Sequence, residues 1–119
     1  QILSVIGARL MEMNAEEHDR SLAFTSHLPF IISSALVQSV PQELSGLIGT
    51  GFRSTSRLAG TPSQMMMGVL QSNRDNILLA LRKFQKELAS IETAMATKDD
   101  FSLDTILNSA QSQYQSMIH

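Results

Sequence analysis

The chain contains no cysteine and no tryptophan among its 119 residues, and only three prolines and one tyrosine. Without cysteine there is no disulfide, no thiol nucleophile and no cysteine-ligated zinc, and a reducing compartment is the default expectation. Long apolar runs are also missing, because the best one, residues 30–40, is interrupted by Ser33, Ser34, Gln38 and Ser39. We therefore expect no membrane span. The net charge of −2 gives no reason to expect a nucleic-acid partner.

The length fits a single domain with a modest core. The chain begins at Gln1, without a methionine or a signal-like segment, so we expect a fragment of a longer protein. Residues 1–13 mix apolar and charged positions in a short run that suits an edge strand or an interdomain connector. We accordingly divide the chain into a connector at 1–13 and a helical domain at 14–119.

Charge is distributed unevenly along the chain. Residues 44–74 contain three arginines, Arg53, Arg57 and Arg74, and no acidic residue, whereas acidic residues collect on both sides of this segment. A locally cationic segment in a slightly acidic chain suits a small anionic ligand. The alternative is that these arginines are simply solvated and bind no ligand.

The first helix should begin at Asn14, which stands three residues before Glu17 as in a capping box. Apolar positions at helical spacing then continue to about Ser39. Pro29 lies inside this run and cannot donate a backbone hydrogen bond, so the helix should kink between Thr25 and Pro29. After it, the glycine-punctuated segment should contain a short helix around residue 44 and a helical turn through residues 54–58.

The longest element should start at Thr61 and Pro62, a threonine cap followed by a proline at the first helical position. Its apolar positions step by threes and fours to Met95 and are interrupted by Asn73. A helix of about 35 residues spans roughly 50 Å, more than the diameter of roughly 35 Å expected for a compact domain of this size. Because the stripe stays apolar throughout, a second chain should cover it. A last amphipathic helix should follow from about Leu103.

These patterns predict an all-α fold with one kinked helix and one very long helix, assembled as an intertwined homodimer.

Few side chains in this fold could take part in binding or catalysis. His27 alone would be a satisfied, partly buried histidine, and Arg57 alone a surface or capping arginine. Together with Arg53, however, they would suit an anion pocket, because guanidiniums bind carboxylates bidentately. No carboxylate pair, Ser-His-Asp set or metal-ligand cluster is apparent, so we expect no metal site.

Several short segments together resemble the C-terminal helical domain of the prephenate and arogenate dehydrogenases of tyrosine biosynthesis. The resemblance covers roughly residues 8–88 and looks most like the cyanobacterial and plant arogenate-type branch. It is carried by Glu17-His18-Asp19, Ser26-His27-Leu28-Pro29, Gly51-Phe52-Arg53 with Thr55 and Arg57, and Asn73-Arg74.

The resemblance implies that the chain is the second half of an oxidoreductase whose N-terminal Rossmann domain binds NAD or NADP. No Gly-x-Gly-x-x-Gly occurs here, so residues 1–13 would be the end of that domain and the fragment would be inactive alone. The intact enzyme would transfer hydride to NAD(P)+ with loss of carbon dioxide, giving 4-hydroxyphenylpyruvate from prephenate or tyrosine from arogenate. It would be a homodimer in the cytoplasm, or in the plastid of a plant.

The resemblance also implies roles for four residues. Arg57 would bind a substrate carboxylate and His27 would line the same pocket. Arg53 would lie in a loop that reaches toward the neighbouring subunit's cleft. His18 would lie at the domain junction, where Asp19 would fix the tautomer of its imidazole.

This sequence departs from the family pattern at Phe30, where many members have a second histidine; that change would shift preference from prephenate toward arogenate. Thr50 in place of a glycine, and the run Met65 to Met67 in place of an aromatic, alter the loop and its contacts. Two alternatives stay open: a non-enzymatic helical dimerisation or regulatory module without a ligand, and the helical domain of a dehydrogenase acting on 3-hydroxy acids. The choice between NAD and NADP, the choice between the two substrates and tyrosine feedback are also left open.

Overall fold

The computed structural model describes residues 14–118, and the connector expected at residues 1–13 lies outside them. No strand occurs within this described range, so the predicted all-α fold class is confirmed. The chain divides between Leu81 and Arg82, within the helix α6 (Arg74–Ala96), into two compact units.

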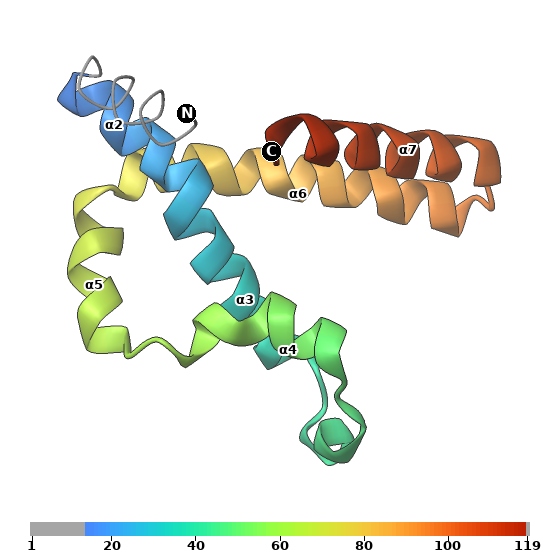
Figure 1. Ribbon diagram of the computed structural model, residues 1–119, viewed down its shortest axis with the longest axis horizontal. Coiled ribbons are helices and arrows are strands. Elements are labelled where there is room, and N and C mark those ends of the chain that lie inside the picture. Colours follow the sequence, from blue (N-terminus) through green and yellow to red (C-terminus); the bar gives the residue numbers. More distant parts are fainter. Residues whose placement is uncertain (1–13, 119) are drawn as a thin grey trace. The chain divides into compact units, whose positions relative to one another are not determined.

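The first unit is built around one uninterrupted helical run. It consists of α2 (Ala15–Leu22), a π-helical turn η1 (Ala23–His27) and α3 (Leu28–Ser39) (Figure 1). Asn14 caps this run as predicted, because its side-chain oxygen accepts a hydrogen bond from the Glu17 N–H at 2.8 Å.

The kink predicted near Pro29 takes the form of a widened turn. The N–H of Leu28 donates to the carbonyl of Ala23, five residues back, instead of to a carbonyl four residues back. Proline has no N–H, and in a regular α-helix its ring crowds the carbonyl four residues earlier, so a widened turn just before Pro29 relieves both problems. The turn ends at His27, whose side chain is only 6% exposed.

By length and composition, the helical run Ala15–Ser39 could also cross a membrane, which corrects the expectation that no such run exists. Core helices of soluble proteins pass the same test. Here His27 and Ser33 are buried and form hydrogen bonds to other elements. Buried polar side chains require partners of this kind, and a single run that passes by length and composition is weak evidence for a membrane span.

Three short elements follow: a 3₁₀ helix η2 (Gln42–Leu47), α4 (Thr50–Ser56) and a 3₁₀ turn η3 (Arg57–Gly60). η2 matches the short helix predicted around residue 44, and the turn predicted through residues 54–58 falls on the end of α4 and the start of η3. Both α4 and η3 pack against α3. Ser33 of α3 donates to the backbone carbonyl of Thr55 at 2.8 Å and so fastens α4 to α3.

The prediction of one helix of about 35 residues is wrong. The structure has two helices, α5 (Ser63–Ser72) and α6 (Arg74–Ala96), and α5 begins one residue later than predicted, with Pro62 as its cap. Between them Asn73 has φ −113° and ψ 26°, outside the helical region, and the chain changes direction there (Figure 1). The longest regular α-helix among residues 14–118 therefore has 23 residues, or roughly 35 Å, and its length alone no longer requires a second body.

The second unit is a hairpin of two helices, formed by the C-terminal part of α6 and by α7 (Asp100–Met117), as predicted for the last helix (Figure 1). Lys98, with a positive φ of 55°, lies in the turn between them. The hollow between the two helices is lined mainly by small or polar side chains of α6, which are Lys86, Ala89, Ser90, Thr93 and Ala94, and by Thr97 of the turn. In residues 82–118, the one apolar side chain described as buried is Ala94.

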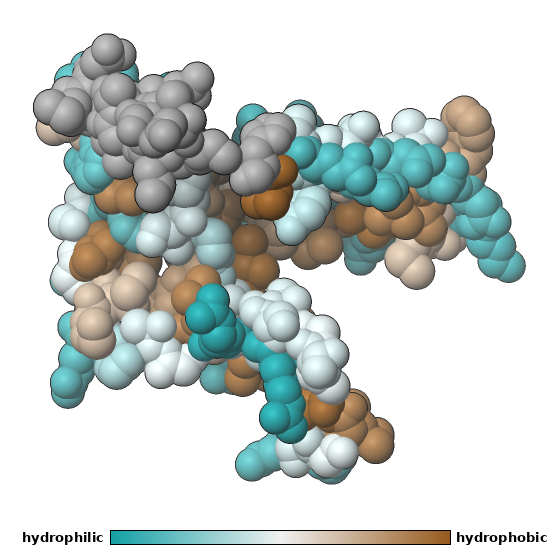
Figure 2. Space-filling view, viewed as in Figure 1, coloured by the Kyte–Doolittle hydropathy of each residue, from teal (hydrophilic) through white to brown (hydrophobic). Residues whose placement is uncertain are grey.

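Large apolar side chains instead lie on the outside of this hairpin. Those more than half exposed are Leu88, Met95, Phe101, Leu107, Tyr114, Met117 and Ile118. Figure 2 shows apolar surface along one face of the hairpin. A patch of this kind marks an interaction surface, so the exposure of these side chains, rather than the length of the helix, indicates a covering partner.

The N-terminus of α7 is capped by a carboxylate. One oxygen of Asp99 accepts from the Ser102 N–H at 3.1 Å and the other accepts from the Ser102 hydroxyl at 2.6 Å. These bonds hold the pKa of the Asp99 carboxyl below its usual value of 3.8. Since the folded pKa is the lower one, the stabilisation by this cap is fully present above the unfolded pKa and is lost as pH falls through the folded pKa.

The variant Asp99→Asn keeps an acceptor for the Ser102 N–H but removes the titrating charge. We expect the first-turn amides of α7 to lose hydrogen-exchange protection in the wild type as pH falls below about 4, and to lose less in the variant. The control is Asp100→Asn, which removes a neighbouring charge and leaves the cap. Equal losses in the wild type and in Asp99→Asn would contradict this assignment.

Candidate functional site

A buried polar cluster joins three parts of the first unit. The side-chain nitrogen of Asn73 lies 2.7 Å from the backbone carbonyl oxygen of Asp19 and 3.2 Å from Nδ1 of His27. His27 is 6% exposed and Asn73 is 8% exposed. The cluster thus links the consecutive elements α2 and η1 to the break before α6, which is far from both in sequence.

The orientation of the Asn73 amide follows from its neighbours. A backbone carbonyl can only accept, so the atom facing Asp19 must be the nitrogen. The amide oxygen accepts from the side-chain nitrogen of Asn76 at 2.9 Å. Three hydrogen bonds therefore hold this side chain, and its direction is fixed.

The two candidate arginines lie on a separate segment of the same unit. Arg53 is in α4 and Arg57 is the first residue of η3, and both are exposed. Thr55, whose carbonyl accepts from Ser33, stands midway between them in the sequence. Within residues 14–118 neither guanidinium has an ion-pair partner, so both charges are available to an anion.

Ser33 follows His27 by six residues, which corresponds to roughly 9 Å of helical rise. The segment with the arginines is therefore fastened to the helix about one and a half turns beyond the imidazole. In the described part of the chain no hydrogen bond or ion pair joins His27 to either arginine. Their convergence at one cavity stays a prediction.

His18 lies apart from this cluster. Its side chain is 46% exposed and its Nδ1 is 4.0 Å from the nearer oxygen of Asp19. That distance is too long for a hydrogen bond, so the Asp19 carboxylate does not fix the imidazole as expected. It is the main-chain carbonyl of Asp19 that takes part in the cluster, through Asn73.

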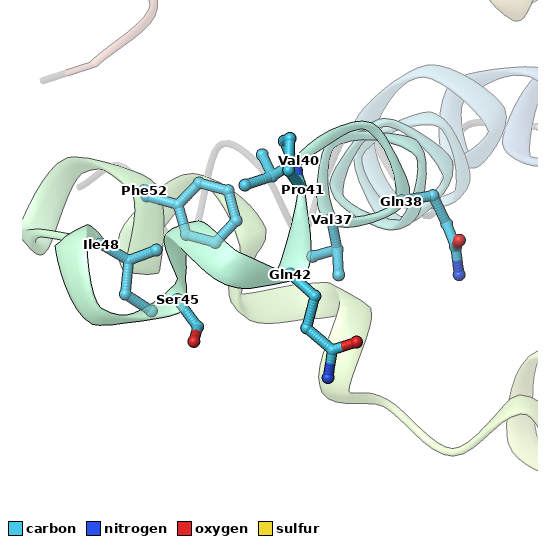
Figure 3. A pocket seen from close by; sticks show the side chains of 8 residues that line it. All are labelled: Val37, Gln38, Val40, Pro41, Gln42, Ser45, Ile48 and Phe52. Carbon is cyan, nitrogen blue, oxygen red and sulfur yellow. The ribbon is translucent and has the colours of Figure 1, made fainter.

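A hollow of about 440 Å³ lies where the end of α3 meets η2 and α4 (Figure 3). Phe52, Ile48, Val40 and Val37 line it together with polar, uncharged residues. Because none of its lining residues titrates, we assign this hollow to packing rather than to chemistry. Among residues 14–118 no group of three or more histidine, aspartate or glutamate side chains could hold a metal ion.

Sequence reasoning missed two members of this arrangement. Asn73 stands out in the sequence as a polar residue on an apolar stripe, and Ser33 as a polar residue in the run 30–40. Neither pattern indicates which residue would be the hydrogen-bond partner. The π-helical turn that ends at His27 has no signal in the sequence beyond Pro29.

Comparison with known proteins adds three findings. The family described as prephenate dehydrogenase, dimerization domain, matches residues 14–109. The cyclohexadienyl dehydrogenase of Zymomonas mobilis is 31% identical over 107 residues, which are 83% of this chain and 36% of that protein. The chain spans about a third of the length of the curated relatives it matches.

Two solved structures have the same fold. The arogenate dehydrogenase of Synechocystis aligns with a TM-score of 0.82 at 23% identity, over 89% of this chain and 41% of that one. The prephenate dehydrogenase of A. aeolicus, in complex with hydroxyphenyl propionate and NAD+, aligns with a TM-score of 0.78 at 23% identity, over 88% of this chain and 39% of that one.

Proposed function

This chain belongs to the prephenate dehydrogenase dimerization-domain family, and from that premise we propose that it is the dimerisation and substrate-binding half of a prephenate or arogenate dehydrogenase. The intact enzyme would catalyse the oxidative decarboxylation of its substrate with NAD(P)+ in tyrosine biosynthesis. The chain's own contribution would be binding and orientation of the substrate, because no described group of side chains is arranged for catalysis.

The observation that carries this proposal is a pair of exposed guanidiniums, without an ion pair among residues 14–118, on a segment that Ser33 fastens to the helical run containing His27. Arg57 would hold a substrate carboxylate bidentately, which suits the planar fork of a guanidinium. His27 would donate a hydrogen bond to a second acceptor on the substrate. Arg53 would reach toward the neighbouring subunit's cleft, and His18 would face the domain junction.

The cofactor would be NAD or NADP, bound mainly by a different domain. The relative from A. aeolicus was solved with NAD+, which supports a nicotinamide dinucleotide without deciding between the two. The residues of this chain do not fit the cofactor themselves, since the sequence contains no glycine-rich dinucleotide fingerprint.

The partner would be a second copy of the chain, joined through the helical domain into an intertwined homodimer. The family's description as a dimerization domain and the exposed apolar side chains of the α6–α7 hairpin support this. The enzyme would work in the cytoplasm, or in the plastid of a plant, without a nucleic-acid or membrane partner.

The test is an assay of the intact enzyme with prephenate and with arogenate, each paired with NAD+ and with NADP+. Formation of the reduced nicotinamide in at least one combination is the expected result. Melting curves with a substrate analogue or tyrosine should show a ligand-dependent rise. No turnover in any combination, together with no melting shift, would favour the alternative of a ligand-free dimerisation module.

A further inference from the structure

The side chain of Asn73 is a buried polar group at a position where the sequence pattern favours an apolar one. It interrupts an apolar stripe, breaks what would otherwise be one helix, and is 8% exposed. A buried amide is destabilising unless its hydrogen bonds are satisfied. Both amide hydrogens and the amide oxygen have partners here, so the side chain is tied in place rather than merely tolerated.

The direction of these bonds fixes the protonation of the imidazole. Since the atom of Asn73 that faces His27 is a nitrogen, it donates, and Nδ1 of His27 must accept at 3.2 Å. An accepting Nδ1 carries no hydrogen, so the neutral ring carries its hydrogen on Nε2. One amide therefore selects one of the two tautomers of His27.

The other ring nitrogen is left for a ligand. In the part of the chain that the structure describes, no buried side-chain nitrogen or oxygen lacks a hydrogen-bond partner. Nε2 makes no bond to a described residue, so it keeps contact with solvent although the side chain as a whole is 6% exposed. The ring thus presents a single N–H donor at the edge of a buried cluster.

We infer that Asn73 is a positioning residue, which holds His27 as the Nε2–H tautomer so that this group donates a hydrogen bond to an oxygen of the anionic substrate. The inference rests on the proposed function for the identity of the ligand, but the tautomer itself does not depend on that function. Asn73 acts through His27 and has no contact with the substrate of its own.

The first experiment measures the tautomer directly. In the intact enzyme labelled with 15N-histidine, long-range 1H–15N NMR spectra should show His27 with its hydrogen on Nε2 and none on Nδ1. The variant Asn73→Asp places an acceptor opposite Nδ1, so a hydrogen should appear on Nδ1. The matched control is Asn108→Asp, which changes an exposed amide that bonds Asp104 instead and should leave the His27 signals unchanged. A hydrogen on Nδ1 in the wild type would overturn the inference.

The second experiment separates positioning from a structural role. Asn73→Ala should raise KM about tenfold, the effect of losing one well-placed hydrogen bond, and change kcat less than about threefold. Adding Asn73→Ala to His27→Ala should raise KM no further, because the first residue works through the second. Additive effects would overturn the inference. A variant that does not fold leaves the wild-type spectrum as the deciding measurement.

The two proposals fail in different ways. If the enzyme turns over neither substrate while His27 still carries its hydrogen on Nε2, the proposed function is wrong and Asn73 positions the imidazole for another acceptor. If the enzyme is active and the hydrogen is on Nδ1, the proposed function stands and the role of Asn73 is wrong.

Discussion

Replacing Arg57 by alanine in the intact enzyme is expected to raise KM for prephenate or arogenate at least tenfold. Losing a charge-assisted hydrogen bond of this kind removes about 1.5–3 kcal/mol of binding, or roughly a tenfold to hundredfold change. The guanidinium has no ion pair among the described residues, so the substitution leaves no protein carboxylate unpaired. The measurement is steady-state kinetics with the preferred substrate and cofactor.

Two further variants sharpen this prediction. Arg57→Lys keeps the charge but not the planar fork, so its KM should lie between those of the wild type and of Arg57→Ala. Arg82→Ala removes another exposed arginine, from α6, and should change KM less than about twofold. An unchanged KM in Arg57→Ala would remove this residue from the substrate site.

Introducing charge on the outer face of α6 is expected to break the dimer. Leu88 and Met95 are 53% and 64% exposed and help to line one apolar hollow on that helix. Covering each side chain is worth about 2 kcal/mol, and in a symmetric dimer each position counts twice. Leu88→Glu with Met95→Glu should therefore weaken dimerisation by more than about a thousandfold. Analytical ultracentrifugation measures this change.

The matched control for the dimer exchanges the same two side chains. Leu88→Met with Met95→Leu keeps the face apolar at nearly constant volume and should leave the dimer intact. Circular dichroism should accompany both measurements, since a hairpin with so little buried apolar surface is expected to lose helix when its cover is removed. A double glutamate variant that dimerises as the wild type does would show that this face is not the interface.

The helical architecture was predictable because its signals are local. Asn14 and Glu17 mark the start of the first run, and apolar spacing marks its extent, so a correct reading needed only neighbours along the chain. Pro29 likewise indicated that the helix would be distorted. It did not show which distortion would occur, because a kink and a widened turn each remove the clash of the proline ring and accommodate its missing N–H.

The break at Asn73 and the partner of His27 were not predictable in this way. The apolar stripe continues across Asn73, so its periodicity reads as one helix, and a single polar residue is tolerated in such a pattern. The bond between Asn73 and His27 joins residues that are 46 positions apart. Nothing local to either residue specifies the other, and only the tertiary fold brings the break at Asn73 next to the first run.

The widened turn η1 also decides which way the helix after it faces. In an α-helix each side chain is rotated by roughly 100° about the axis relative to the one before it. A turn whose hydrogen bond spans five residues instead of four contains one additional residue. Because of that additional residue, Leu28 and Ser33 lie on the buried side of α3. Deleting one residue from η1 would rotate α3 by roughly 100° about its own axis and turn Ser33 away from the carbonyl of Thr55.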